Sequence, residues 1–437
     1  MSNPVNQPLI AIELNEVNVR FVERYVEKGV LHQFRRLLCE HGYSETTSET
    51  TYEHIEPWIQ WVTAHTGLTL AEHGVFRLGD IVYHDIPQIW EQLEKKGLKV
   101  GAISPMNAKC RLNSPAFFVP DPWTKTNIVA PSVLTRMYHA IAVAVNQNAE
   151  GRIGAKTAIH LIAGALRVAA PRNYLAYMSY AARALREPWY RAIFLDLLMA
   201  DLFVYCVGET KPHFASLFLN AAAHIQHHYM FSSAAYDGPS RNPEWYIKRG
   251  KDPLLDVYRA YDGILQQIQA RFPGARLMIA TGLHQDPHSS VIYYWRLRNH
   301  AQFLRKIGVP FVRVEPRMSR DFLIVCDGPD QARAAEAVLN SAHGPQDMPL
   351  FEVNNRGNDL FVMLIYPHDV DREFSYTVGN QAFQGLREDI AFVALKNGEH
   401  NGIGYFLDTG APAAAQRDAF PLTEIPQRIT NALFEGG

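Results

Sequence analysis

Cysteine is scarce in this chain, which has four in 437 residues: Cys39, Cys110, Cys206 and Cys326. They lie far apart and form neither a CxxC pair nor a zinc-finger spacing. The sequence therefore offers no disulfide framework and no cysteine-based zinc site. We expect free thiols in a reducing cytoplasm.

An excess of basic residues is also missing. The chain has 42 Lys and Arg against 44 Asp and Glu, which gives a formal net charge of -2. Because nothing here would neutralise a run of phosphates, a nucleic acid is excluded as the expected partner. A small-molecule substrate is the remaining expectation.

Long apolar runs are missing too. No stretch reaches the ~18 uncharged apolar residues of a membrane-spanning helix, so no membrane span is expected. The first residues, MSNPVNQPLIAIELN, lack a positive start followed by a long apolar stretch. They are predicted to form a first strand rather than a signal peptide, and we expect a cytoplasmic protein.

What the sequence does contain is the pattern of an α/β fold. Short apolar runs at Leu9–Leu14, Val100–Ile103, Leu217–Leu219 and Leu277–Ala280 are predicted to be buried strands. They alternate with amphipathic stretches of helical spacing, such as residues 17–28. This alternation predicts a mostly parallel sheet with helices on both faces.

Two segments depart from this alternation. Residues 128–206 are rich in Ala, Leu, Arg and Tyr with helical periodicity, which predicts a helical insertion. Residues 318–367 have a strand–helix–strand–strand pattern, which predicts a small α+β cap. The ranges 1–127, 207–317 and 368–437 then form the predicted core.

Four stretches carry motifs in a consistent order. They are ELNEVNVRFVERYVEKGVLHQF, EPWIQWVTAHTGLTLAEHGV, SLFLNAAAHIQHHYM, and the pair LMIATGLHQ and GEHNGIGYFLDTG. Together they resemble the type I phosphodiesterases and nucleotide pyrophosphatases of the alkaline phosphatase superfamily. The resemblance implies an alkaline phosphatase-like fold and action on a phosphate- or sulfate-containing small molecule.

The resemblance also identifies family residues that this chain lacks. Enzymes of the superfamily use two metal ions and a hydroxyl nucleophile. His227 and His400 match two ligands of the first metal. Other family positions hold residues that cannot replace them, namely Asn15 and Ala223 for Asp, Pro57 for the nucleophile, and Gly282 with Leu283 for an Asp-His pair. The resemblance therefore implies loss of the second metal and of the covalent intermediate.

Other polar side chains lie near predicted strand ends and helix starts. Glu13 and Glu16 are at the end of the first strand, and Glu56 precedes a helix. Because open α/β sheets bind ligands at the carboxyl ends of their strands, these three are candidate catalytic residues. A set of candidate substrate-binding residues lies on the same stretches, namely Asn15, His65 and His73.

Two arrangements of the site stay open. In one, His227 and His400 bind a single divalent metal such as Zn or Mn, with His284 or a Glu as the third ligand. In the other, no metal binds and the three Glu residues act as acids, bases or orienting groups. Against a catalytic role, a Glu such as Glu56 beside a helix start is typical of a cap.

Three functions follow from these alternatives. The first is a divergent hydrolase or transferase of the alkaline phosphatase superfamily. The second is a metal-independent group transferase, for example a glycosyltransferase, that uses Glu residues on the same scaffold. The third is a catalytically inactive binding protein. The motifs specify neither a substrate nor an oligomeric state.

Overall fold

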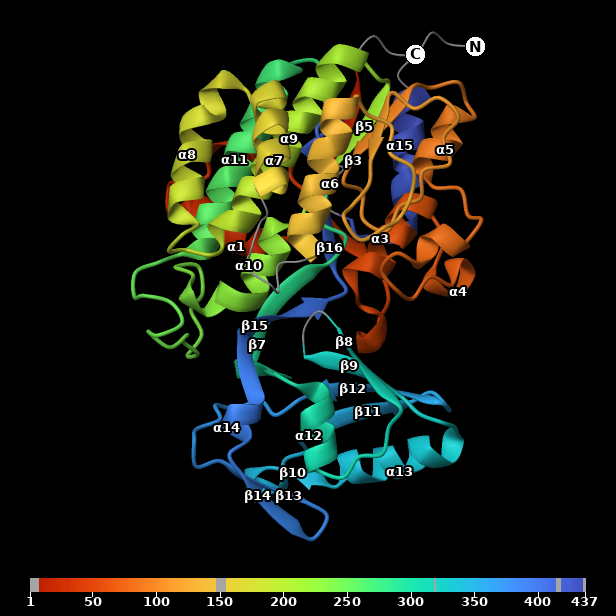
Figure 1. Cartoon of the computed structure of the whole chain (residues 1–437). Helices are drawn as coiled ribbons and strands as arrows, with labels where there is room; N and C mark the ends of the chain where they lie inside the picture. Colours follow the sequence, from red (N-terminus) through yellow and green to blue (C-terminus); the bar gives the residue numbers. More distant parts are fainter. Residues whose placement is uncertain (1–7, 147–154, 318–319, 414–417, 435–437) are drawn as a thin grey trace.

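The computed structural model describes residues 8–146, 155–317, 320–413 and 418–434 (Figure 1). The predicted core, insertion and cap ranges also include residues 1–7, 147–154, 318–319, 414–417 and 435–437, which lie outside the described residues.

An eight-stranded sheet forms the centre of the larger part of the molecule, in the order β17-β2-β16-β6-β1-β5-β3-β4. Its strands are β1 (Leu9–Leu14), β2 (Ser44–Thr47), β3 (Val100–Ile103), β4 (Phe117–Val119), β5 (Phe214–Leu219), β6 (Arg276–Ala280), β16 (Gly404–Asp408) and β17 (Phe420–Pro421). The neighbours from β6 to β4 pair in parallel, and β16 runs antiparallel to β6 and β2. All four predicted strands lie in this sheet, so the expected mostly parallel α/β fold is confirmed.

Helices cover both faces of the sheet, as the alternation of side chains along β1 requires. Ile10, Ile12 and Leu14 belong to one buried cluster, while Leu9 and Ala11 belong to another. The first cluster includes the helices α1 (Val19–Glu27), α2 (His32–His41), α9 (Tyr190–Thr210) and α11 (Pro253–Arg271). The second includes α3 (Pro57–Thr66), α5 (Ile89–Glu94) and α15 (Ile425–Phe434).

The predicted insertion is occupied by helices. They are α6 (Ser132–Asn146), α7 (Ala155–Val168), α8 (Tyr174–Arg183) and α9. The last of them continues to Thr210, beyond the predicted limit at 206, and packs directly on β3 and β5. Its buried side chains belong to the main core, because an almost wholly apolar helix is stable only when covered on most sides. The helical segment is therefore joined to the core by α9 rather than set apart from it.

A smaller α+β unit lies at one end of the molecule (Figure 1). The predicted strand–helix–strand–strand pattern is present as β9 (Asp321–Val325), α13 (Pro329–Asn340), β11 (Phe351–Asn355) and β12 (Asp359–Leu364). The hydrophobic cluster of this unit runs from Trp295 to Ile390, so the unit is larger than the predicted range 318–367. Further elements complete it, namely β8 (Arg313–Pro316), β10 (Ala342–His343), β13 (Ser375–Val378), β14 (Gln381–Gln384), α12 (His300–Lys306) and α14 (Leu386–Asp389).

Two long strands join this unit to the core. They are β7 (His284–Leu297) and β15 (Ile390–Asn401), which pair in an antiparallel ribbon. The pairing is irregular at two places, one of them between Lys396 and Gly398. The core end of the ribbon brings His400 next to α10 (Ala221–Tyr229).

The start of α10 is held by a buried carboxylate on α9. Asp196 accepts hydrogen bonds from the backbone N–H of Ala221 (2.7 Å) and from the hydroxyl of Tyr261 (2.6 Å). Burial raises the pKa of Asp196 to about 6, and the Tyr261 hydrogen bond acts in the opposite direction. This contact fixes the helix that carries His227.

Asp196→Asn is expected to change how stability depends on pH. An unfolded aspartate has a pKa of about 3.9, so the folded state of the wild type favours the neutral acid. That contribution is complete below pH ~4 and is lost as the pH rises through the folded value of about 6. Asn is neutral at every pH. As the pH rises through this range, the free energy of unfolding of Asp196→Asn should therefore increase by about 2–3 kcal/mol relative to that of the wild type.

Urea unfolding of both proteins across the same pH range measures this difference. The exposed Asp327, changed to Asn, is the matched control and should follow the wild type. A parallel pH dependence of wild type and Asp196→Asn would contradict the assignment.

Candidate functional site

Glu16 is the residue around which the candidate site is built. It follows β1 in a left-handed backbone conformation (φ 60°), which is uncommon outside glycine and costs about 1–2 kcal/mol. Its backbone N–H donates to Thr281, and its carbonyl accepts from Gln226 Nε2 (2.6 Å).

Two histidines from distant parts of the chain meet the Glu16 carboxylate. His227 on α10 places Nε2 3.3 Å from Glu16 Oε2, and His400 on β15 places Nε2 3.2 Å from the same atom. The two Nε2 atoms are 3.1 Å apart. These three ligand atoms therefore form a nearly equilateral triangle.

Each member of the triangle is oriented by a further partner. His227 Nδ1 lies 3.3 Å from the carbonyl of Gly398, and His400 Nδ1 lies 3.5 Å from Glu56 Oε2. Asn15 Nδ2 donates to Glu16 Oε1 (3.0 Å). Metal-binding histidines commonly bond a carbonyl or a carboxylate through the second ring nitrogen. Both imidazoles therefore direct Nε2 towards Glu16.

The donor set fits a single divalent metal. Ligand atoms about 2.0–2.1 Å from a tetrahedral zinc lie about 3.3–3.4 Å from one another, close to the observed separations. Two imidazoles with one carboxylate are a common ligand set of catalytic zinc, which keeps a position open for water or substrate. Among the described residues, Glu16, His227 and His400 form the group whose ligand atoms lie within 4.8 Å of one another.

The charges of the triangle support one another. Burial alone would raise the pKa of Glu16, but His400 and His227 hold it well below its usual range. Burial lowers the pKa of His400, and the neighbouring Glu16 outweighs this and raises it. Glu56 is less enclosed, with a side-chain exposure of 31% against 3% for Glu16. Burial still raises the pKa of Glu56 to about 7, opposed by His400.

Cationic side chains lie on the same side as Glu56. Lys396 precedes His400 on β15, and burial together with Arg320 lowers the pKa of its ammonium group. Arg320 stands over the ring of Tyr294, 4.2 Å from its centroid. Within the described residues neither Lys396 nor Arg320 forms an ion pair, which leaves both available to an anion. The sequence analysis missed both of these residues.

Glu56 is not the helix cap that its position suggests. It is the N-cap residue of α3, yet within the described structure its side chain makes no capping hydrogen bond. Pro57 occupies the first helical position, where it offers neither a hydroxyl nor a backbone N–H. The Glu56 carboxylate is turned instead towards His400.

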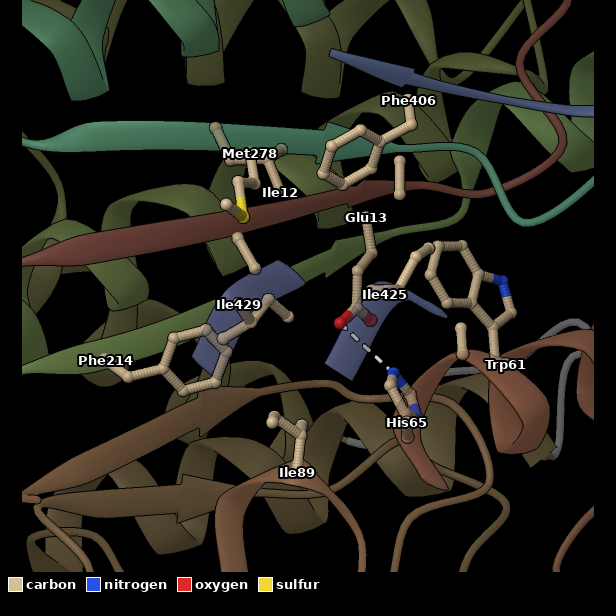
Figure 2. Close-up of a pocket in the computed structure, with 13 residues that line it drawn as sticks. Ile12, Glu13, Trp61, His65, Ile89, Phe214, Met278, Phe406, Ile425 and Ile429 are labelled. Atoms are coloured by element: carbon tan, nitrogen blue, oxygen red, sulfur yellow. Dashed lines mark hydrogen bonds and ion pairs between the residues drawn. The ribbon is translucent and has the colours of Figure 1, made fainter. Parts of the chain in front are cut away.

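Glu13 is not brought into the site. It lies on the opposite face of β1 from Ile12, and its Oε1 is 3.1 Å from His65 Nε2 on α3 (Figure 2). The pair is enclosed in a small cavity whose other lining residues are mainly apolar, among them Ile89, Phe214 and Ile425. Side chains alternate between the two faces along a strand, and Glu13 points to the face opposite to that of Ile12 and Leu14. Neither Glu13 nor His65 contacts the triangle.

Two further predicted histidines have other partners. His284 bonds the carbonyl of Ile403 through Nδ1 (2.6 Å) and Asp286 through Nε2 (3.2 Å), so it is not a member of the triangle, whose third atom comes from Glu16. His73 accepts the N–H of Val75 at Nδ1 (3.0 Å) and contacts the Thr63 hydroxyl at Nε2 (3.2 Å). It ends the short helix α4 (Leu70–His73) and has no contact with the triangle.

The indole of Trp61 lies between Asn15 and Gly282. Trp61 Nε1 donates to Asn15 Oδ1 (2.7 Å). The same ring lies so close to Gly282 that an added Cβ would be 3.0–3.3 Å from its atoms. Gly282 also has a positive φ of 73°. A larger residue at position 282 would thus meet both backbone strain and the indole.

Comparison with known proteins agrees with a distant similarity in architecture. No protein family model and no curated protein matches the chain. Among solved structures, wild-type alkaline phosphatase PafA is 11% identical, with 99% of this chain and 96% of that chain covered and a TM-score of 0.47. Murine ectonucleotide pyrophosphatase/phosphodiesterase 5 is 11% identical, with 98% and 95% covered and a TM-score of 0.45.

A third similar structure is phosphonoacetate hydrolase from Sinorhizobium meliloti 1021 in complex with phosphonoacetate. It is 12% identical, with 98% of this chain and 96% of that chain covered and a TM-score of 0.44. These proteins are of the kinds that the sequence motifs resemble. Because identities are near one tenth and the TM-scores are below 0.5, none of their chemistry is carried over to this chain.

Trp61→Phe tests the support of Glu16. The substitution leaves Asn15 Oδ1 without its donor in a buried position, so we expect a stability loss of about 1–3 kcal/mol. It also loosens Asn15, which holds Glu16, so the affinity for added Zn²⁺ should fall by about 10–100-fold. Calorimetric titration and thermal unfolding measure the two effects.

Trp58 on the same helix provides the control. Its Nε1 donates to the backbone carbonyl of Phe76 rather than to Asn15. Trp58→Phe should therefore keep the wild-type zinc affinity. Equal zinc affinities of Trp61→Phe and the wild type would show that Trp61 does not support the site.

Proposed function

We propose that this chain is a hydrolase that uses one divalent metal to cleave an ester of a phosphate- or sulfate-containing small molecule. The observation that carries the proposal is the triangle of Glu16, His227 and His400, in which the second nitrogen of each imidazole is anchored. Zinc or manganese is the metal class that this donor set suits. When bound there, it would polarise an ester oxygen and lower the pKa of water.

The cationic side chains favour an anionic substrate. Lys396 lies near Glu56, and Arg320 lies near Lys396; neither cation has an ion pair within the described residues. An Arg and a Lys together suit the oxygens of a phosphoryl or sulfuryl group, which spread their charge in several directions. We therefore assign substrate binding to these two residues.

Glu56 is the carboxylate best placed to handle a proton. Glu16 is enclosed and occupied by both histidines, whereas Glu56 is partly exposed and lies beside His400 Nδ1. Pro57 supplies no hydroxyl, so water rather than a side chain attacks the ester in this proposal. Glu56 would accept a proton from that water, while Asn15 keeps Glu16 in place.

The metal-independent transferase receives less support. That alternative needs the three glutamates at one place, and Glu13 is paired with His65 on the other face of β1. A catalytically inactive binding protein is an outcome of the tests below. We retain a cytoplasmic location and a small-molecule substrate as parts of the proposal. No helix among the described residues is both long and apolar enough to cross a membrane.

Metal content is the first test. The full chain, purified without chelator and analysed by mass spectrometry for Zn and Mn, should hold about one metal per chain. His227→Ala and His400→Ala should each lower the metal affinity at least about tenfold, because each removes one of three ligands. His284→Gln is the matched control and should retain the metal, since both nitrogens of His284 face other partners.

A chain that binds no Zn or Mn even when either metal is added would overturn the proposed metal site. Loss of metal in His284→Gln, with its fold intact by circular dichroism, would show that the ligand set is assigned incorrectly.

Activity on simple esters is the second test. With metal restored, the wild type should hydrolyse at least one of p-nitrophenyl phosphate, bis-p-nitrophenyl phosphate and p-nitrophenyl sulfate. Glu56→Gln should lower kcat by about 100-fold or more, the usual contribution of a general base. Lys396→Met should act chiefly on KM, because a substrate-binding cation is lost while metal and base remain.

Lys99 directly precedes β3, and its ammonium group donates to the backbone carbonyl of Thr210, so it allows a matched control. Lys99→Met removes a lysine without touching the site and should leave both kinetic constants unchanged. A metal-loaded protein with no activity on any of the three esters would favour the binding-protein alternative.

A further inference from the structure

The helical segment exposes an unusual number of large apolar side chains. On α7 they are Ile159, Ile162 and Leu166, which are 63%, 60% and 67% exposed. Spacings of three and four residues place them on one face of the helix. On the opposite side of α7, Gly164 contacts Met137 and Val168 is buried. The helix is thus apolar nearly all round, although one face is uncovered, and such a face normally meets a partner.

The next helix in the sequence also exposes large apolar side chains. Leu175 and Met178 on α8 are 75% and 62% exposed, and Leu185, just beyond it, is 85% exposed. A 3-10 turn at Pro171–Asn173 joins α7 directly to α8. Figure 1 places both helices on the outside of the core, at the opposite end from the α+β unit. We call the exposed apolar residues of 159–186 the helical face.

The segment that carries the helical face also has an excess of positive charge. Residues 159–186 include four arginines and not one Asp or Glu, whereas the whole chain has a formal net charge of -2. Arg183 pairs with Glu187, and Arg167 stands over the ring of Tyr205. Arg172 and Arg186 are exposed and form no ion pair within the described residues. Two free guanidinium groups therefore flank the apolar side chains.

We propose that the helical face binds the surface of a membrane that contains anionic lipids, with α7 and α8 lying in the headgroup region. Apolar side chains that enter the interface, together with flanking cations, are the composition of interfacial helices. Each Arg near an anionic leaflet adds to the attraction. Since no described helix can cross a membrane, the chain would lie on the surface. This proposal does not rest on the hydrolase activity.

Two other occupants fit less well. In a symmetric dimer the same face would meet itself, which would bring Arg172 and Arg186 towards like charges with no carboxylate in the face to neutralise them. A nucleic acid would pair with the guanidinium groups but would leave Leu175 and Leu185 without an apolar partner. An anionic lipid surface provides both the charge and the apolar phase.

Vesicle co-sedimentation of the full chain tests the proposal. We expect binding to phosphatidylcholine vesicles with about 30% phosphatidylserine, and at least about tenfold weaker binding to phosphatidylcholine alone. Binding should also weaken in about 0.5 M salt, because screening shortens the reach of the charges.

Two variants separate the apolar and the charged contributions. Ile162→Ser, Leu166→Ser and Leu175→Ser together should weaken binding at least about thirtyfold, because three exposed side chains no longer enter the interface. Arg172→Glu with Arg186→Glu should weaken it about thirtyfold or more at low salt. Both changes affect exposed residues, so circular dichroism and thermal unfolding should match the wild type.

Matched controls lie outside the helical face. Val312 is 58% exposed on the α+β unit, and Arg249 is exposed on a loop of the core. Val312→Ser with Arg249→Glu should bind vesicles as the wild type does. The proposal is overturned if the wild type binds neither vesicle or if the triple Ser variant binds equally well. It is also overturned if light scattering shows that the wild type is a dimer and the triple Ser variant a monomer, while the wild type binds no vesicles.

Discussion

The contact of Glu16 with His227 and His400 is the interaction on which the candidate site depends. A buried carboxylate is costly unless it is paired or liganded, and two imidazoles converge on this one. The left-handed backbone at Glu16 is a second cost, which the surrounding hydrogen bonds from Gln226 and Asn15 offset. A residue placed at such expense in a buried position is better explained by a ligand than by packing.

Trp61 links the support of Glu16 to the backbone at Gly282. The indole bonds Asn15 on one side and lies against Gly282 on the other, so a large apolar ring lies between two positions where the resembling family has carboxylates. Neutral Asn15 suits this arrangement, because its amide can accept from the indole and donate to Glu16.

The sequence predicts the scaffold better than the directions of individual side chains. The strands of the parallel sheet are visible as apolar runs, and the meeting of His227 with His400 follows from the resemblance. The sequence groups Glu13 with Glu16 because both lie at the end of the first strand, but the pleat turns Glu13 to the other face, towards His65. Arg320 comes from the α+β unit, and no local pattern links it to His400. The approach of Arg320 to Lys396 depends on how β7 and β15 join the two parts.

A net charge near zero also concealed the distribution of charge along the chain. The value of -2 excludes a uniformly basic surface, yet residues 159–186 have four arginines without a single carboxylate. Hydrophobic periodicity predicted that these residues form helices, but it could not distinguish a covered face from an uncovered one. Only the packing of α9 on the sheet shows that α7 and α8 are the outer layer. Because the apolar residues of that layer are accompanied by cations rather than by carboxylates, the partner must be both apolar and anionic, which a lipid surface is.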